Sequence, residues 1–248
     1  SAASDVYKRQ GQMSCNPAIG GLGKSHLVRE IDAMGGLMAV CADKAGIHFK
    51  ILNSSKGPAV RATRSQSDRL LYSEAVKSII NSEHSLSTLS DEVIDIEIKN
   101  GNAAGVKLRS GEVIRAQKII LTAGTFLNGK LFTGEEEEDG GRKKSQPSKI
   151  LANCLRNLDL GDARLKTGTP PRILASSIDF SALEVQPGDS PRPCMSFIGS
   201  PEDHPDQMNC FITRTNAQTH DFIRSGLDRS PMFSGRIDGV GPRYCPSI

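Results

Sequence analysis

The spacing of apolar residues predicts two helices in the first third of the chain. Apolar side chains recur every three to four positions, and a pair of glycines then provides a helix end: Leu27, Val28, Ile31, Met34 and Gly35-Gly36. A second helix is predicted from about Ser65 to Ile80, where apolar positions repeat in the same way. Residues 51–64 lie between them and are rich in glycine, proline and cations, so a loop is expected there.

The hydrophobic period changes to two after Glu92. Residues 93–98 and 101–109 alternate between apolar and other side chains. Ser110-Gly111 then forms a tight turn into residues 112–116. The pattern therefore predicts a patch of three antiparallel strands.

A short, continuous apolar run over residues 118–124 predicts a strand that is buried on both faces. The run ends in Thr122, Ala123 and Gly124, and such small residues would let a cofactor approach the backbone closely. Ala123 and Gly124 are therefore candidate cofactor-binding residues. An ordinary strand end explains the same residues equally well.

The remaining segments predict less regular structure. Residues 134–144 are a charged run between glycines, for which a solvated loop is expected. Residues 164–173 contain a Pro-Pro pair and indicate a domain junction. Residues 176–248 are rich in proline and glycine and have weak periodicity, so they predict short strands and loops.

The order of these elements is that of the FAD domain in flavoproteins with two dinucleotide-binding folds. The predicted class is α/β, with a partial Rossmann-like FAD-binding domain over residues 11–163. A mixed, β-rich, inserted nicotinamide-binding domain is expected over residues 164–248. The strand and G-x-G-x-x-G loop that bind a pyrophosphate would lie upstream of Gly11. Residues 1–10 resemble a translated sequencing adapter, and the chain is interpreted as an internal fragment of a longer protein.

The composition fits a soluble globular protein of one or two domains. The chain has 248 residues, of which 37% are hydrophobic and 24% charged. No apolar run approaches the roughly 18 residues of a membrane span. A net charge of +3 is too small to indicate nucleic acid or a membrane by itself.

The cysteines are scattered along the chain and are expected to be reduced thiols of a cytoplasmic protein, most of them small buried apolar groups. They are Cys15, Cys41, Cys154, Cys194, Cys210 and Cys245. Neither they nor the histidines show the spacing of metal ligands, so no metal site is predicted.

Residues 19–27, IGGLGKSHL, contain the Gly-Lys-Ser ending of a Walker A loop. The full loop requires a glycine where Ala18 stands, and it must follow a buried strand. Residues 11–16 do not resemble such a strand. A nucleoside triphosphatase is therefore kept only as an alternative.

Several long blocks resemble the glucose-inhibited division protein A family. They are GQMSCNPAIGGLGKSHLVREIDAMGGLM, ILNSSKGPAVRATRSQSDRLLY, LTAGTFLNGKLFTG, RLKTGTPPRI and RSPMFSGRIDGVGPRYCPSI. The resemblance runs from Gly11 to Ile248 in the family's order and spacing. Members of this family are the flavin subunit of the tRNA uridine 5-carboxymethylaminomethyl modification enzyme.

The resemblance implies an enzyme that uses FAD, NAD(H) as reductant and methylenetetrahydrofolate as carbon donor. The implied product carries an aminomethyl or carboxymethylaminomethyl group on C5 of the wobble uridine (U34) of tRNA. The implied partner is a GTP-hydrolysing subunit, with a homodimer of the flavin subunit inside a heterotetramer and no membrane. The implied location is the cytoplasm, or the mitochondrion if the source is eukaryotic.

The family's two functional cysteines correspond to Cys15 and Cys245. A thiolate that adds to C6 of uridine makes C5 nucleophilic, and nearby cations or a helix N-terminus favour the thiolate. Which of the two attacks C6 stays open. The family's FAD contacts correspond to Val93 and Ser148. Its nicotinamide segment corresponds to Gly241, Pro242, Arg243, Tyr244, Pro246, Ser247 and Ile248.

A cationic loop and helix contain Lys56, Arg61, Arg64 and Arg69. Such a group can neutralise the phosphates of tRNA or of a cofactor. A solvated helix face is an equally good interpretation. Two alternative functions also stay open: a folate- and FAD-dependent tRNA uridine-5-methyltransferase, and an inactive truncated fragment.

Overall fold

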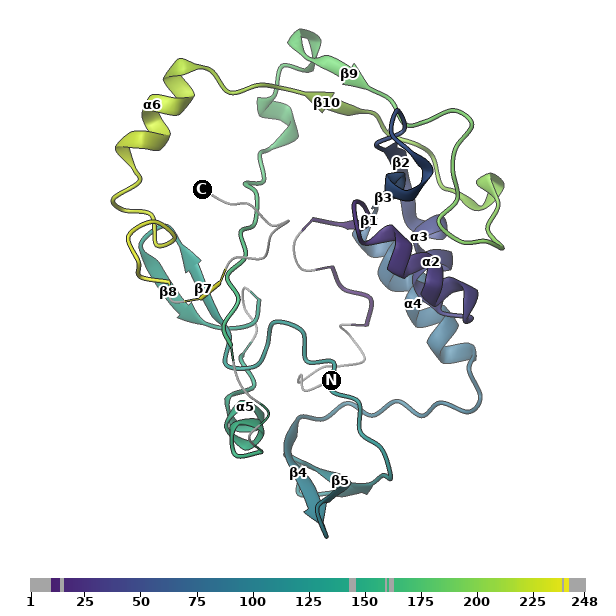
Figure 1. Cartoon of the computed structure of the whole chain (residues 1–248), viewed down its shortest axis with the longest axis vertical. Coiled ribbons are helices and arrows are strands. Elements are labelled where there is room, and N and C mark those ends of the chain that lie inside the picture. Colours follow the sequence, from purple (N-terminus) through teal and green to yellow (C-terminus); the bar gives the residue numbers. More distant parts are fainter. Residues whose placement is uncertain are drawn as a thin grey trace. The chain divides into compact units, whose positions relative to one another are not determined.

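The computed structural model describes residues 10–13, 16–142, 146–158, 160, 163–237 and 239–240. The chain divides into two compact units, each assembled from segments that are separate in the sequence (Figure 1). Arg9–Ser87 and Pro170–Thr215 form one, which we call the helical unit. Thr88–Thr169 and the residues from Asn216 onward belong to the other, the hairpin unit. One boundary therefore falls between Thr169 and Pro170, inside the segment in which a junction was predicted.

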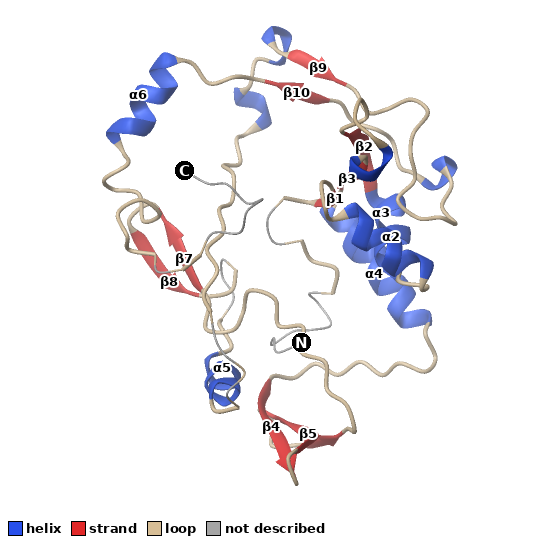
Figure 2. Cartoon of the chain, in the orientation of Figure 1, coloured by secondary structure: helices blue, strands red, loops and turns tan. Residues whose placement is uncertain are grey.

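The helical unit contains a three-stranded antiparallel sheet with strand order β1-β3-β2. Its strands are β1 (Ala18–Gly20), β2 (Gly46–Leu52) and β3 (Ala62–Ser67). Three helices lie beside this sheet, as Figures 1 and 2 show. They are α2 (Ser25–Ala33), α3 (Leu37–Ala45) and α4 (Arg69–Ser82).

Helix α2 confirms the first predicted helix and its glycine stop. The N–H of Gly36 donates to the carbonyl of Ile31, and the N–H of Gly35 donates to Asp32. With Gly35 at φ +85°, this is the Schellman end that a glycine pair favours. The predicted apolar face is largely exposed in the structure, because Val28 is buried but Met34 is 80% exposed.

Helix α3 was not predicted, and it forms the centre of the hydrophobic core. Ala39, Cys41, Ala42 and Ala45 are all fully buried. Its buried positions include the charged Asp43 and its exposed positions include Met38, so polar and apolar residues do not separate into two faces that an amphipathic period would reveal. Its core partners come from β2, α4 and the later segment of the same unit, and they are Phe49, Tyr72, Val76 and Met195.

The second predicted helix begins later than expected, and much of the expected loop is a hairpin. Helix α4 starts at Arg69, and Asp68 caps it by accepting hydrogen bonds from the N–H groups of Leu70 and Leu71 at 2.8 and 3.0 Å. Residues 62–67 are strand β3, and β2 covers residues 46–52. The strand escaped prediction because its buried residues include serines, such as Ser65, rather than apolar side chains.

The later segment of the helical unit confirms the expectation of short strands and loops. Strand β9 (Glu184–Gln186) pairs with β10 (Cys210–Ile212), and short 3-10 turns lie at Ala175–Ser177, Phe180–Ala182 and Pro201–Asp203. This segment is fixed to β2 by backbone hydrogen bonds. The N–H of Met208 donates to Ile47 and that of Asp189 donates to Phe49.

The hairpin unit contains the predicted antiparallel patch, with strand order β4-β5-β6. Its strands are β4 (Val93–Lys99), β5 (Asn102–Leu108) and β6 (Val113–Arg115). A hairpin of β7 (Lys130–Thr133) and β8 (Glu136–Asp139) follows, with helices α5 (Lys149–Arg156) and α6 (Ala217–Ser225). The mixture of helices and small antiparallel sheets confirms the α/β class.

Two local predictions for the hairpin unit were wrong. Residues 118–124 form no strand, and Ile120 is 84% exposed. A strand needs a neighbour for its backbone groups, and among the described residues none pairs with this run. The charged run includes strand β8 instead of being a loop throughout, although all four strand residues are solvent-exposed as expected. In the described part of the chain, no helix has both the length and the apolar character to cross a membrane.

Candidate functional site

The two predicted catalytic cysteines, Cys15 and Cys245, lie outside the described residues. The predicted nicotinamide segment, residues 241–248, lies outside them as well. The assignments to these residues therefore stay predictions. The glycine-rich turn that follows Cys15 is described, and its geometry bears on the Walker A alternative.

This turn is built to pack strands and to start a helix. Strand β1 is a three-residue edge strand in an antiparallel sheet, whereas a Walker A loop follows a buried strand. The Ser25 hydroxyl donates to the carbonyl of Gly21 at 2.8 Å, and Ser25 is 3% exposed. A hydroxyl held inside the turn is not presented to a metal–phosphate complex. The geometry therefore disfavours the triphosphatase alternative.

Three of the predicted cofactor contacts are brought together in the hairpin unit. Phe126 donates its N–H to the carbonyl of Ala123, and its own carbonyl accepts the N–H of Ser148 at 2.8 Å. Ser148 is 3% exposed and precedes helix α5. Gly124 has φ +58° and open space where a side chain would begin. Through Phe126, the small residues Ala123 and Gly124 are therefore linked to Ser148 at the start of helix α5.

Val93 belongs to the same unit but to another part of it. It begins strand β4 opposite Leu108 and is half-buried. Helix α5 packs beside this strand, where the Cys154 thiol donates to the Asp95 carboxylate at 2.9 Å. Burial is the larger cause of a raised pKa of Cys154, and the contact with Asp95 is the smaller one. The thiol therefore stays protonated at neutral pH.

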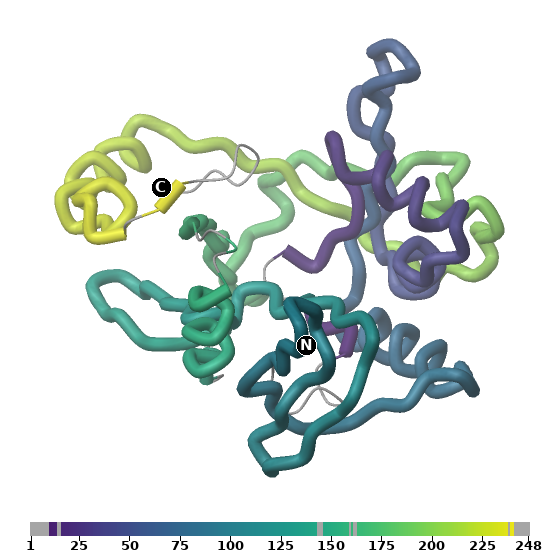
Figure 3. Tube along the Cα trace, turned by 60° about the horizontal axis from the view of Figure 1, so that its bottom comes forward, coloured from purple at the N-terminus to yellow at the C-terminus, as the bar shows by residue number. Residues whose placement is uncertain are grey.

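The predicted basic group is spread along one hairpin. Lys56 and Arg61 are exposed in the connection between β2 and β3, which stands out from its unit in Figure 3. Arg64 lies within β3. Arg69 lies beyond the opposite end of that strand, and its guanidinium donates to the carbonyl of Met13 at 2.9 Å.

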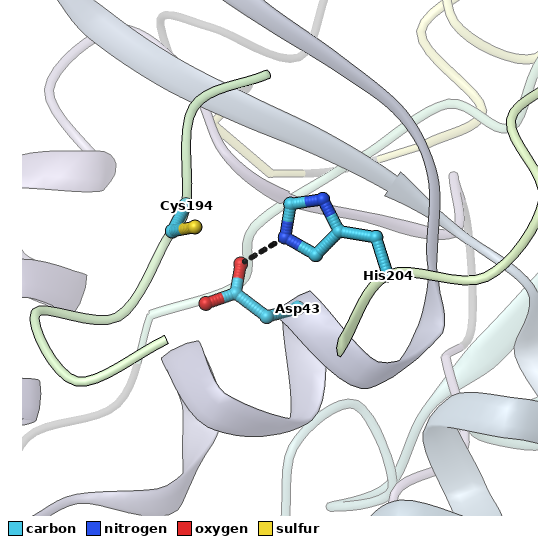
Figure 4. A group of neighbouring side chains, drawn as sticks. All are labelled: Asp43, Cys194 and His204. Atoms are coloured by element: carbon cyan, nitrogen blue, oxygen red, sulfur yellow. Dashed lines mark ion pairs between the residues drawn. The ribbon is translucent and has the colours of Figure 1, made fainter. Parts of the chain in front are cut away.

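A cluster that the sequence did not predict lies in the helical unit (Figure 4). Asp43 of α3, Cys194 and His204 each direct one oxygen, sulfur or nitrogen atom toward the others, and these atoms all lie within 4.8 Å of one another. The Asp43 carboxylate is 3.4 Å from Nε2 of His204. The His204 ring stacks on Phe49, with the ring centroids 4.1 Å apart.

Backbone donors fix the Asp43 carboxylate. Oδ1 accepts the N–H of Met195 at 2.7 Å, and Oδ2 accepts the N–H of Ser196 at 2.9 Å. Burial raises the pKa of the Asp43 carboxyl, against the opposing effect of these two donors. Burial likewise lowers the pKa of the His204 imidazole, and the charge of Asp43 opposes this shift. Burial therefore acts against a fully charged pair at this position.

Comparison with known proteins identifies the architecture. The chain is similar to GidA of Aquifex aeolicus in its form I crystal, with 44% identity and a TM-score of 0.86 over 96% of this chain and 40% of that chain. The form II crystal gives 43% identity and a TM-score of 0.82 over 89% of this chain and 38% of that chain. The fold is thus that of a GidA-like α/β protein.

The model of the family described as glucose inhibited division protein A matches residues 5–248. The chain therefore belongs to the glucose inhibited division protein A family. It spans about two fifths of the length of the solved relatives, at 40% and 38%.

Proposed function

We propose that this chain is part of the flavin-dependent subunit of an enzyme that modifies the wobble uridine of tRNA. The observation that carries the proposal is the family match over residues 5–248, supported by 44% identity to the Aquifex aeolicus structure. The activity, substrates and partners concern the whole protein, of which this chain corresponds to 40% of the solved relative.

The proposed share of this chain in FAD binding is limited. The contacts are Val93, Ser148 and the backbone of Ala123 and Gly124. The adjacency of the last three, and the open space around Gly124, fit an outer part of a flavin site. The described residues contain no strand that leads into a G-x-G-x-x-G loop, so we do not assign the pyrophosphate to them.

The proposed chemistry joins a one-carbon unit to C5 of uridine. FAD, in its form reduced by NADH, and methylenetetrahydrofolate as the carbon donor would be the cofactors of this transfer. The thiolate of Cys15 or Cys245 adds to C6, which makes C5 nucleophilic. After C5 has bonded to the one-carbon unit and the bonds of that carbon to the folate have broken, releasing tetrahydrofolate, the C5 proton leaves and the thiolate is eliminated from C6. The second cysteine assists, and the nicotinamide would contact residues 241–248.

The proposed partners are tRNA and a GTP-hydrolysing subunit, in a heterotetramer built on a homodimer of the flavin subunit in the cytoplasm. Lys56 and Arg61 are the stronger candidates for tRNA phosphates, because both are exposed. Arg64 and Arg69 are the weaker ones, since Arg69 already donates to Met13.

The test uses a full-length family protein that carries this sequence, expressed in cells that lack their own copy. Mass spectrometry of tRNA nucleosides should detect a C5-aminomethyl-type group at the wobble position. Cys15→Ala and Cys245→Ala should each abolish it while flavin absorbance of the purified protein is retained. Unchanged modification in both variants would contradict the thiolate roles.

The same measurements separate the alternatives. Finding 5-methyluridine as the product would favour the tRNA uridine-5-methyltransferase alternative. For the chain itself, residues 1–248, stoichiometric flavin absorbance after purification would reject the inactive-fragment alternative.

A further inference from the structure

Three potential metal ligands from distant parts of the sequence meet in the helical unit. Asp43 lies on α3, whereas Cys194 and His204 lie on the segment that carries the 3-10 turn Pro201–Asp203. Their ligand atoms lie within 4.8 Å of one another (Figure 4). The cluster shares no residue with the proposed flavin contacts or with the two candidate catalytic cysteines.

The His204 imidazole is buried, and its one contact with Asp43, at 3.4 Å, is longer than a good hydrogen bond. Its side chain is 0% exposed, and both ring nitrogens are buried without a hydrogen bond. Stacking on Phe49 holds the ring in place. Unpartnered buried nitrogens are costly unless another species satisfies them, and a metal ion does so by accepting the Nε2 lone pair.

The spacing of the first two ligands fits a tetrahedral ion. Nε2 of His204 and Oδ1 of Asp43 are 3.4 Å apart, which is longer than a good hydrogen bond. Zinc–nitrogen and zinc–oxygen bonds of about 2.0–2.2 Å place two tetrahedral ligands about 3.3 Å apart. The Cys194 sulfur lies at most 4.8 Å from the others, so it needs to approach by no more than about 1.3 Å to complete the same geometry.

The surroundings hold the ligands in the way that metal sites require. The N–H groups of Met195 and Ser196 fix the Asp43 carboxylate, as outer-shell donors do in metal sites. Arg29 donates to the carbonyl of Cys194 at 2.8 Å and positions that residue. A carboxylate and a thiolate together balance the charge of a divalent ion.

We propose that Asp43, Cys194 and His204 bind a zinc-type divalent cation, with water as the fourth ligand. The mixture of sulfur, nitrogen and oxygen ligands selects zinc or a chemically similar ion over magnesium or calcium, which take oxygen ligands. Binding releases the Cys194 thiol proton to solvent. The ion joins α3 to the segment around residues 194–204, and its role is to stabilise the helical unit.

The test uses the chain of residues 1–248, freed of metal by a chelator. One equivalent of Co²⁺ should give a thiolate-to-cobalt charge-transfer band, and Zn²⁺ should displace it and raise the Tm. Cys194→Ala should remove the band and weaken Zn²⁺ binding by at least about 100-fold, since even outer-shell changes cost 10–100-fold. Cys210→Ala, which removes another half-buried thiol of the same unit, should change neither.

A second variant distinguishes the loss of metal binding from a failure to fold. His204→Phe keeps a ring on Phe49 and removes both unpartnered nitrogens, so it should fold without metal, with the wild-type circular dichroism spectrum, and should not bind Zn²⁺. A wild-type chain that binds neither ion would overturn the proposal. So would a cobalt band that persists in Cys194→Ala, and in either case the Asp43–His204 contact is a direct pair without metal.

Discussion

The Cα of Gly20 faces the carbonyl oxygen of Thr63 so closely that a Cβ on Gly20 would overlap it. The N–H of Gly21 donates to the same oxygen at 3.1 Å. Gly20 also has φ +86°, a conformation that side chains other than glycine rarely adopt. Gly20 therefore serves the packing of β1 against β3.

We predict that Gly20→Ala destabilises the chain by roughly 3 kcal/mol or more, because strain in φ adds to the overlap with Thr63. Gly23 is the matched control. It has φ +71° but nothing within 4 Å of an added Cβ, so Gly23→Ala should cost only about 1–2 kcal/mol. Urea denaturation of both variants measures the difference in their free energies of unfolding. Equal losses of stability would show that the strain in φ, and not the overlap with Thr63, causes the destabilisation.

Lys24 and Ser25 separate the helix-start role from a phosphate role. Ser25→Ala should lower the free energy of unfolding by about 1 kcal/mol, because its buried hydrogen bond to Gly21 is lost. Exposed Lys24→Ala should change stability little. Neither the parent nor the variants should hydrolyse ATP or GTP. Hydrolysis that disappears in Lys24→Ala would restore the Walker A interpretation.

Asp68 determines where α4 begins. Asp68→Ala should cost about 0.5–2 kcal/mol, because the N–H groups of Leu70 and Leu71 lose their acceptor. Asp68→Asn keeps an acceptor oxygen and should cost much less. Thermal unfolding of the three proteins tests this order. A similar loss in the Asn variant would mean that the charge, and not the cap, stabilises the helix.

Phe49 fills the centre of the helical unit, where it is 0% exposed. Phe49→Ala should destabilise by about 3–5 kcal/mol, since it leaves a cavity beside α3 and removes the stack with His204. Phe49→Leu refills much of the volume and should cost less. Denaturation curves followed by circular dichroism compare them, and a loss below 1 kcal/mol in the Ala variant would contradict the core assignment.

Tyr72 makes stability fall at alkaline pH. Burial, with a smaller effect of Cys41, raises the pKa of Tyr72 to about 12 from 10.0. Between these values the folded state holds a proton that the unfolded state releases, so the free energy of unfolding decreases as pH rises from 10 to 12. The expected decrease is on the order of 2 kcal/mol.

Tyr72→Phe removes this titration while it keeps the buried ring. The wild-type chain should therefore lose more stability than the variant between pH 9 and pH 12. Spectrophotometric titration should show a tyrosine with a pKa near 12 that is missing in the variant. Equal pH dependence of the two proteins would contradict the raised pKa.

Predictions that rested on local periodicity succeeded where one element alone explains the pattern. The glycine pair after α2 and the alternation in β4 and β5 are local features, and all three elements formed as expected. The run 118–124 failed because a strand requires a pairing partner that its own sequence does not contain. Helix α3 was missed because it buries the charged Asp43 and exposes Met38, so its sequence shows no separate polar face.

The sequence by itself determined the α/β class, the antiparallel patch and, through its motifs, the family. It also named Cys15 and Cys245, whose roles rest on the resemblance. The tertiary structure alone decided that Cys194, which is half-buried, meets the buried Asp43 and His204. Spacing along the chain does not reveal such a group, because the contact depends on how the later segment folds back onto α3. Burial removes water from these polar atoms, and only the packed fold imposes that cost.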